Sequence, residues 1–294
     1  MLKQRLESKE DWQLQYYLVL FFDLLGQREK LRQLTAFPND EEGGKRIASV
    51  LQATVGRVIK LRVGFESFFE GMSTETELSR NLEPDQRELL MQHTQYRMNS
   101  FGFSDSFLVF VPLGTNDENC TQMNGVHRSM LAACSIMSIA LSEGIAMRGG
   151  IDVGLGMELY KGEIYGPCLE RTYHLESKQA DYHRISVGVE LVQYLASVQK
   201  QKSMTTFGKC AAALAKQCAS LVFKDWDDTL ALDYLGDGFK AAAGANSDYT
   251  LFVKVVTFAD SEKQKWSCAG NTKLAQRYDR LNSYLASRDD IWTK

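Results

Sequence analysis

Two apolar stretches, one near the N-terminus and one near residue 100, form the clearest pattern in the chain. Residues 16–22 are apolar at every position and rich in Tyr, Phe and Val, which is typical of a central strand buried on both faces. Residues 96–103 and 106–112 predict two more strands, joined by a tight turn at Ser104 and Asp105. The pattern therefore predicts a central strand and a hairpin.

Helical periodicity fills most of the segments between these strands. Gly26 opens a turn into a helical stretch at residues 27–34. Residues 44–69 repeat their apolar positions at helical spacing, so they predict one long helix packed on the sheet. Residues 71–95 are polar and acidic, which favours a surface connection with a short helix. A further helix is expected at residues 123–143.

The next segment alternates strand and helix. Residues 145–156 have the glycines and the alternation of a bent strand, residues 167–180 predict a helix, and residues 184–187 predict a strand. The order strand, helices, hairpin, helix, strand is the split βαβ order of a ferredoxin-like sheet. We therefore predict an α+β fold whose two central strands carry Asp23 and Asp105.

The C-terminal third is predicted to continue the same domain. Beyond about residue 190 we expect helices, a strand pair around residues 221–235 and a final helix at residues 272–286. No internal repeat and no low-complexity linker interrupts the chain. A single elaborated domain is therefore expected rather than two.

Composition narrows the class of protein without naming a reaction. With 294 residues, 44% hydrophobic and 24% charged, the chain has the composition of an ordinary globular protein. No apolar run approaches the roughly 20 residues of a membrane span, and the polar N-terminus is no secretion signal. We therefore expect a cytoplasmic protein that does not bind a membrane. A net charge of −3 does not indicate binding to nucleic acid, which favours a basic surface. The expected partner is instead a small anion held by metal.

The cysteines add little chemistry. Six are scattered along the chain with no Cys-x-x-Cys pair, which argues against a zinc knuckle and a disulfide framework. We expect reduced thiols that behave as small buried hydrophobic residues.

Asp23 and Asp105 are the candidates for chemistry. Each lies beside an apolar strand, where a carboxylate costs free energy unless something pairs with it. On neighbouring strands the two would lie about 5 Å apart and could hold one or two divalent cations, which is the outline of a phosphoryl-transfer site. The alternatives are a helix N-cap for Asp23 and an ordinary hairpin-turn residue for Asp105.

Four motifs in order carry a family resemblance. They are residues 22–26 (Phe-Asp-Leu-Leu-Gly), 103–106 (Phe-Ser-Asp-Ser), 148–154 (Arg-Gly-Gly-Ile-Asp-Val-Gly) and 164–167 (Ile-Tyr-Gly-Pro). Together they resemble the class III nucleotidyl cyclase homology domain, over roughly residues 15–190. Residues 165–170 and 174–185 are similar to the bacterial Pycsar pyrimidine cyclases of anti-phage defence, which make cyclic UMP or cyclic CMP.

The resemblance implies a site and an organisation. Residues 15–190 would be the nucleotidyl cyclase homology domain, with residues 191–294 as a C-terminal extension packed on it. Asp23 and Asp105, with the backbone carbonyl of Leu24, would hold two divalent cations, Mn²⁺ or Mg²⁺, since both ions take oxygen ligands. Backbone amides at Leu25 and Gly26 would face the phosphates of the nucleotide.

Departures from the purine cyclases suggest a pyrimidine substrate. Phe101 lies where those enzymes usually carry a residue that reads the base, and a phenyl ring makes no such hydrogen bonds. The partner position falls on Glu163 or, with a one-residue slip, on Ile164. Arg97, expected on the same strand and face as Phe101, could donate to a pyrimidine carbonyl. Large side chains such as Phe103 would shrink the base pocket, unless they belong to the hydrophobic core.

The transition-state residues of the family are not recovered. The Asn and Arg that the family carries on the helix after Gly166 fall on Glu170 and His174, and neither supports a transfer of role. Another cation would have to stabilise the extra negative charge. The candidates are Arg171, Lys178 and Arg184. We expect Arg184 to bind the nucleotide, whereas Arg171 and Lys178 could instead belong to a solvated helix face.

Three functions compete at this point. The first is a pyrimidine nucleotidyl cyclase that prefers UTP over CTP, works as a homodimer with shared active sites, and makes a messenger for a separate cyclic-nucleotide-activated effector. The second is a purine cyclase or diguanylate-type enzyme, which the absence of a Gly-Gly-Asp-Glu-Phe hairpin disfavours. The third is a silent nucleotide-binding module, motivated by Glu170 and His174.

Overall fold

The first apolar run forms the central strand β1 (Leu14–Leu24). The computed structural model describes residues 14–32, 34–93, 97–114, 120–160, 162–201, 205–243 and 249–293. All of residues 17–22 are buried, because β1 lies between two antiparallel neighbours and is covered on both faces. Those neighbours are β3 (Ser106–Gly114) and β4 (Met147–Tyr160).

The sheet confirms the predicted split βαβ order. The strands run β2-β3-β1-β4-β6-β8-β7, and β5 pairs with β4 outside this path. The first and third strands of the chain are therefore adjacent, and the fourth lies on the other side of the first, as in a ferredoxin-like sheet. The remaining strands are β2 (Asn99–Phe103), β5 (Glu163–Tyr165), β6 (Ile185–Val187), β7 (Val222–Lys224) and β8 (Leu230–Leu232).

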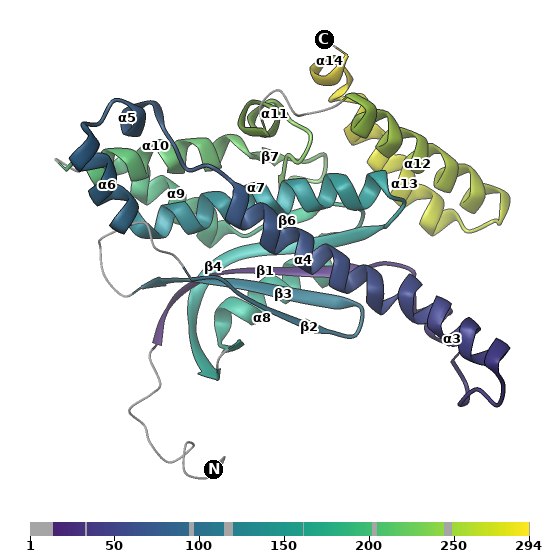
Figure 1. Cartoon of the computed structure of the whole chain (residues 1–294). Coiled ribbons are helices and arrows are strands. Elements are labelled where there is room, and N and C mark those ends of the chain that lie inside the picture. Colours follow the sequence, from purple (N-terminus) through teal and green to yellow (C-terminus); the bar gives the residue numbers. More distant parts are fainter. Residues whose placement is uncertain are drawn as a thin grey trace, which may run out of the picture.

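One face of the sheet carries a thick layer of helices (Figure 1). Helix α7 (Cys120–Ser142) lies in this layer and packs against α4 (Val55–Gly71), α10 (Thr206–Ser220) and α12 (Tyr249–Cys268), with α9 (Val189–Lys200) beside α10. Leu18, Leu20 and Phe22 of β1 point into the main hydrophobic core under these helices. Most of the buried apolar side chains among the described residues belong to this core.

The opposite face has much less cover. Tyr17, Val19 and Phe21 point into a second, smaller core, which packs against α8 (Pro167–His174). The chain continues from α8 as a π-helical turn, Leu175–Gln179. Gly150 of β4 permits this packing, because a Cβ there would lie 2.4 Å from a backbone carbonyl oxygen of α8.

Several predicted boundaries were wrong. The long helix expected at residues 44–69 is two helices, α3 (Glu41–Ala53) and α4, which break at Thr54. The Thr54 hydroxyl donates to the carbonyl oxygen of Val50 at 2.7 Å, a bond through which a threonine side chain bends a helix. The helix predicted at residues 167–180 ends at His174 and continues as the π-helical turn.

The polar connection before the hairpin also differs from the prediction. It holds two short helices rather than one, α5 (Glu77–Arg80) and α6 (Pro84–His93). Strand β2 begins at Asn99, so it is shorter than the predicted strand, whose first residue lies outside the described residues. Early in the chain, the helix expected after Gly26 is the short α2 (Gln27–Leu31).

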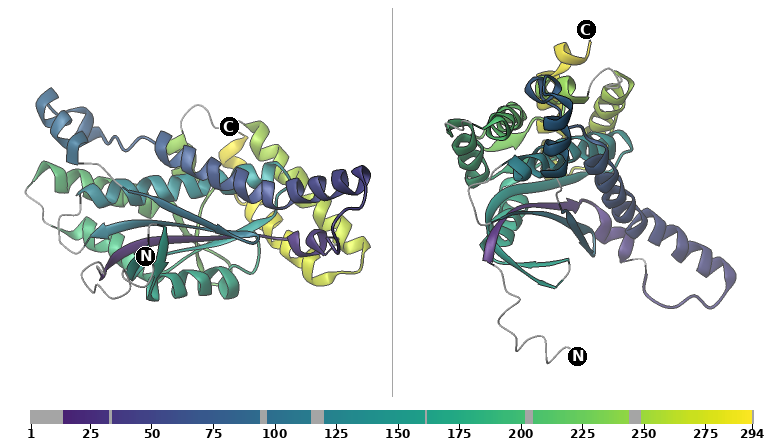
Figure 2. Two further views of the ribbon diagram at one scale, coloured as in Figure 1. Left: turned by 60° about the horizontal axis from the view of Figure 1, so that its bottom comes forward. Right: turned by 60° about the vertical axis from the view of Figure 1, so that its left-hand side comes forward.

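The C-terminal part of the chain extends the same sheet and the same helical layer. Strands β7 and β8 join it through β6, and the predicted final helix is confirmed as α13 (Thr272–Ala286). Figure 2 shows α12 and α13, in yellow-green and yellow, side by side at one end of the molecule. The remaining helices are α11 (Asp237–Ala243) and α14 (Asp289–Trp292). No helix among the described ranges is both long and apolar enough to cross a membrane.

Candidate functional site

Asp23 lies near the end of β1, on the thinly covered face of the sheet. Its neighbours in register are Ser106 on β3 and Arg148 on β4. The Ser106 hydroxyl donates to Asp23 Oδ1 at 3.1 Å, and the Asp23 side chain is 21% exposed. Because Asp23 belongs to a strand and α2 begins four residues later at Gln27, the helix N-cap alternative is wrong.

The tip of the β2–β3 hairpin brings Asp105 to the same end of the sheet. Ser104 turns the chain with a φ of 52°, and the backbone N–H of Leu24 donates to the carbonyl oxygen of Asp105 at 3.0 Å. This bond ties the hairpin tip to the end of β1. Burial raises the pKa of Asp23 above its ordinary value, and the nearby charge of Asp105 raises it further. A partly buried carboxylate beside a second carboxylate suits a site for a cation.

The donor atoms fit a hard divalent ion. Mg²⁺ in particular is usually held by one or two carboxylates, with waters and substrate phosphates completing its ligands. Asp23 and Asp105 supply the two carboxylates, and the carbonyl of Leu24 stays a predicted third donor. Within the described ranges, no three His, Cys, Asp or Glu side chains gather as a metal-binding set. A cation here would therefore depend on these two residues and on the substrate.

Arg148 and Glu176 adjoin Asp23, and sequence reasoning gave them no role. Arg148 Nη2 lies 3.4 Å from Asp23 Oδ2, and Arg148 Nε lies 2.6 Å from Glu176 Oε1. Burial raises the pKa of Glu176 to about 7, and the charge of Asp23 contributes to the rise. Both residues stand in the motifs quoted above, but only the pairing of β1 with β4 shows that Arg148 faces Asp23.

Two of the proposed base-recognition residues, Arg97 and Glu163, lie at the other end of the sheet from Asp23. Arg97 precedes β2 instead of lying on it, and its Nη2 is 2.7 Å from Glu158 Oε1 on β4. Glu163 is exposed on β5 opposite Tyr160 of β4, whereas Ile164, opposite Glu158, points into the smaller core. The structure thus brings Arg97, Glu158 and Glu163 to one region, and Glu158 was not anticipated.

Aromatic side chains surround the aspartate end of this face. Phe101 and Phe103 are opposite Leu108 and Ser106 in the β2–β3 register, which puts them on the face of Asp23. Phe103 is 49% exposed, so its assignment to the core was wrong. Its ring centroid lies 5.8 Å from that of Phe21 and 6.3 Å from that of Phe101. These rings form an exposed aromatic surface beside the carboxylates.

The phosphate-facing role predicted for Leu25 was wrong. The Leu25 N–H donates to the carbonyl oxygen of Ala146 at 2.8 Å. This backbone donor is therefore already used at the end of the sheet and is not free to bind phosphate. Gly26 is exposed and turns the chain with a φ of 79°, a conformation that favours glycine. Its predicted contact with phosphate stays a prediction.

Arg184 is a structural residue rather than a nucleotide ligand. Its side chain is buried, and its guanidinium donates to Asp225 at 2.6 Å and to Asp227 at 2.7 and 2.9 Å. It also donates to the backbone carbonyl oxygen of Gln179. With its donors occupied in this way, Arg184 lacks the freedom to bind phosphate.

The residues at the transition-state positions have no common target. Glu170 and His174 are exposed and line a hollow with Asp152. Arg171 Nε lies 3.3 Å from Asp152 Oδ2, and its Nη2 donates to the carbonyl oxygen of Val153 at 2.6 Å. Arg171 is therefore engaged with β4, while Lys178 is exposed.

Comparison with known proteins gives a distant resemblance. No protein-family model matches this chain, and no curated protein matches it. It is similar to the crystal structure of the adenylyl cyclase CyaB from P. aeruginosa, with 14% identity and a TM-score of 0.36 over 64% of this chain and 83% of that chain. It is also similar to a bacterial light-regulated adenylyl cyclase, with 12% identity and a TM-score of 0.35 over 77% of this chain and 54% of the other. A fold does not fix a reaction, so the chemistry has to come from the residues of the site.

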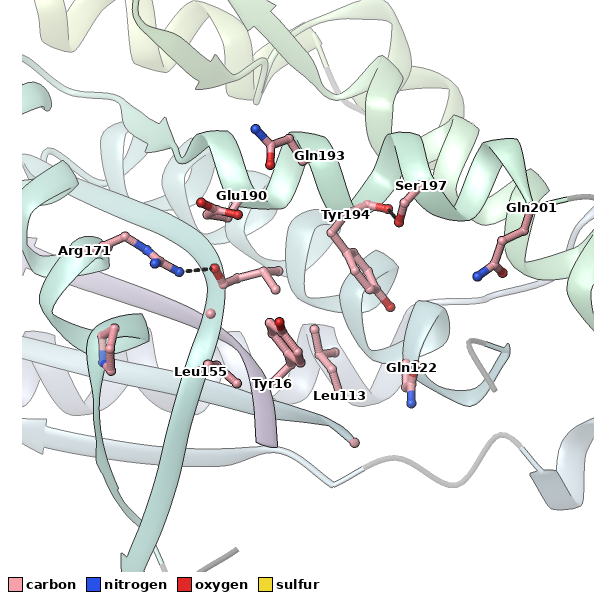
Figure 3. Close-up of a pocket in the computed structure, with 14 residues that line it drawn as sticks. Tyr16, Leu113, Gln122, Leu155, Arg171, Glu190, Gln193, Tyr194, Ser197 and Gln201 are labelled. Carbon is pink, nitrogen blue, oxygen red and sulfur yellow. Dashed lines mark hydrogen bonds between the residues drawn. The ribbon is translucent and has the colours of Figure 1, made fainter. Parts of the chain in front are cut away.

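A hollow of about 550 Å³ lies at the opposite end of β1 from Asp23 (Figure 3). Tyr16, Gln122, Tyr194 and Arg171 are among the residues around it. Seven residues of strand separate Tyr16 from Asp23, which is roughly 23 Å. Neither aspartate lines this hollow, so it is distinct from the candidate cation site.

Proposed function

We propose that this protein is a divalent-cation-dependent pyrimidine nucleotide cyclase that converts UTP into 3′,5′-cyclic UMP and pyrophosphate. The observation that carries the proposal is the convergence of Asp23 and Asp105 at one end of the sheet. The hydrogen bond from Leu24 to Asp105 holds the two together, and the raised pKa of Asp23 reflects its burial and the nearby charge of Asp105. The proposed cofactors are two ions of Mn²⁺ or Mg²⁺.

The reaction fits what these residues can do. The ribose 3′-hydroxyl oxygen forms a bond to the α-phosphorus, the bond from that phosphorus to the bridging oxygen breaks, and pyrophosphate leaves with the electron pair. The hydroxyl proton passes to water. Bound divalent ions would supply charge neutralisation at the phosphates and a more acidic hydroxyl. Asp23 and Asp105 would hold those ions, and the hydrogen bonds from Ser106 to Asp23 and from the Leu24 N–H to the Asp105 carbonyl position the two residues.

The aromatic surface supports a pyrimidine substrate. Phe101 and Phe103 present exposed rings on the face of Asp23, and rings stack on a base without reading its edge. A pyrimidine needs less room than a purine, and Arg97 could donate to a carbonyl of uracil or cytosine. UTP is the proposed substrate, with CTP as the alternative.

The separation between the two ends of β2 supports a homodimer with shared sites. The five residues of β2 alone put roughly 13 Å between the Arg97 end and the Asp105 end. In an antiparallel pair of chains, the Arg97 end of one chain would face the aspartates of the other. A two-fold dimer of this kind is the commonest assembly of soluble oligomers.

The cellular role follows from the motif resemblance. The resemblance to Pycsar cyclases, quoted above on residues 165–170 and 174–185, supports a messenger role in bacterial anti-phage defence. The cyclic nucleotide would act on a separate effector that it activates. Neither nucleic acid nor a membrane is a proposed partner.

The test is an incubation of the full chain with Mn²⁺ and each of the four ribonucleoside triphosphates, with products identified by mass. Cyclic UMP with pyrophosphate is the expected result, and cyclic CMP would select the alternative substrate. A purine product would show that the argument from Phe101 is wrong. If no product forms but UTP binds, the silent nucleotide-binding module is the better description.

Matched variants connect the product to the site. Asp23→Asn and Asp105→Asn keep the size of each side chain and remove its charge, so each is expected to abolish product formation while the thermal unfolding curve stays near that of the wild type. Asp233→Asn is the control, because Asp233 is 15% exposed and pairs with Arg288 away from the site. Unchanged product formation in either site variant would contradict the assignment.

A further inference from the structure

Arg148 contacts two carboxylates, Asp23 of the candidate cation site and Glu176, which is itself close enough to Asp23 for the two side chains to interact. Its Nη2 is 3.4 Å from Asp23 Oδ2, and its Nε is 2.6 Å from Glu176 Oε1. A guanidinium can bind two carboxylates at once because it carries five N–H donors in a fixed fork. The ion pair with Glu176 is the shorter of the two, and the contact with Asp23 is the one that has hydrogen-bond geometry, so Arg148 engages both carboxylates.

The Glu176 side chain is buried, and the packing around it fixes its position. Its side chain is 3% exposed, and it lies on the π-helical turn that follows α8. This turn presses on Gly150, where a Cβ would lie 2.9 Å from the backbone nitrogen of Glu176. Glu176 therefore cannot move far without moving the turn, and its carboxylate stays beside Arg148.

The surroundings make Arg148 depend on these carboxylates. His183 is buried nearby, and the charges of Arg148 and Arg277 add to the effect of burial in lowering its pKa. Arg277 itself has a lowered pKa, first from burial and then from the charge of Arg148. Arg277 has a carboxylate partner of its own in Asp181, so Glu176 and Asp23 supply the negative charge that Arg148 contacts.

We propose that Arg148 and Glu176 are positioning residues that set the affinity of the Asp23–Asp105 site for its cation. The inference rests on the proposed function. Without a cation, Arg148 holds Asp23 Oδ2 and neutralises part of its charge. When a cation binds, it competes with Arg148 for that oxygen, and Glu176 keeps the guanidinium paired. Residues that contact metal ligands in this way commonly change metal affinity by ten- to a hundredfold when mutated.

The two residues should act in opposite directions. Glu176→Gln removes the carboxylate that forms the shorter ion pair with Arg148, so the guanidinium binds Asp23 more strongly and the affinity for Mn²⁺ falls about tenfold. Arg148→Gln removes the competitor, so the affinity for Mn²⁺ rises, by about as much. A pair that served the fold alone would lower the affinity in both variants or in neither.

The experiment measures Mn²⁺ binding to the full chain from the loss of the electron paramagnetic resonance signal of the hydrated ion, without any nucleotide. Arg148→Lys keeps the positive charge and is expected to bind Mn²⁺ close to the wild-type affinity. Asp233→Asn again serves as the control, because it breaks a partly buried ion pair that lies elsewhere. Thermal unfolding of each variant checks the fold, and Glu176→Asp replaces Glu176→Gln if the latter does not fold.

The outcomes separate this inference from the proposed function. Opposite shifts in Glu176→Gln and Arg148→Gln support it. If the wild type binds Mn²⁺ and makes product but both variants shift the same way, or neither shifts, the positioning role is wrong and the cyclase proposal stands. If the wild type binds no Mn²⁺ in this assay, this inference is overturned. If it then still makes product, the cyclase proposal stands with a cation that enters together with the nucleotide, and if it makes none, the cation site itself is wrong.

Discussion

His183 gives a prediction whose size follows from the structure. Its side chain is 1% exposed, and within the described part of the chain neither ring nitrogen has a hydrogen-bond partner. The ring lies 4.5 Å from the ring of Tyr278, centroid to centroid. Burial lowers the pKa of His183 to about 3, and the charges of Arg277 and Arg148 contribute to the shift. The histidine therefore behaves as a buried aromatic ring that must stay neutral.

The sign and size of the pH effect follow from this shift. The ordinary pKa of histidine in an unfolded chain is about 6.5, so the neutral form contributes its full stability above that pH and loses it as the pH falls towards 3. Each pH unit below 6.5 costs about 1.4 kcal/mol, so at about pH 5 the cost is about 2 kcal/mol. His183→Phe keeps a ring against Tyr278 and cannot be protonated, so it should remove this loss.

Urea unfolding at about pH 7 and pH 5 measures the effect. Between these pH values, the unfolding free energy of the wild type should fall by about 2 kcal/mol more than that of His183→Phe. His127 is buried and its pKa is lowered to about 4, but it titrates in both proteins and cancels in the comparison. The exposed His174, replaced by Gln, is the control and should follow the wild type. Parallel pH profiles for His183→Phe and the wild type would refute the reasoning, as would a large loss of stability at pH 7.

Three further substitutions test the packing. Gly150→Ala places a Cβ 2.4 Å from the carbonyl oxygen of Thr172, so we expect a loss of about 1–3 kcal/mol in thermal unfolding together with lost product formation; a wild-type melting curve would contradict the packing of α8. Gly44→Ala, on α3 with nothing within 4 Å of the new Cβ, should instead stabilise by about 0.5–1 kcal/mol in the same assay, and a lower melting temperature would count against the exposed helix. Arg184→Met removes a buried guanidinium from its partners Asp225 and Asp227, whose side chains are 8% and 24% exposed, and should cost about 3–5 kcal/mol in urea unfolding, whereas a neutral effect would show that these ion pairs do not stabilise the fold.

The sheet could be predicted because its signals are local. An uninterrupted apolar run marks β1, two shorter runs around a turn mark the hairpin, and their order gives the split βαβ connection. The break at Thr54 could not be predicted from periodicity, since the apolar spacing continues across it from α3 into α4. What ends α3 is a side-chain hydrogen bond to Val50, which the hydrophobic pattern does not contain.

The aspartates could be predicted as candidates, but their neighbours could not. A carboxylate at the end of an apolar strand stands out in the sequence, whereas Arg148 is one arginine among many until the register of β1 with β4 sets it opposite Asp23. For Arg184 the sequence predicted a ligand-binding role that the structure does not support. Its partners Asp225 and Asp227 lie some 40 residues later in the chain, so only the tertiary structure shows that its charge is already used.

The uneven cover of the sheet explains where the site lies. Alternate residues of β1 face the thick helical layer, so a carboxylate on that side would be buried without water. The other residues face α8, whose Tyr173 ring reaches Phe21 at 5.5 Å between centroids. Asp23 is the next residue on that face and is partly exposed. The carboxylate thus lies where the cover of the thin face ends, and its partial exposure leaves it accessible from solvent.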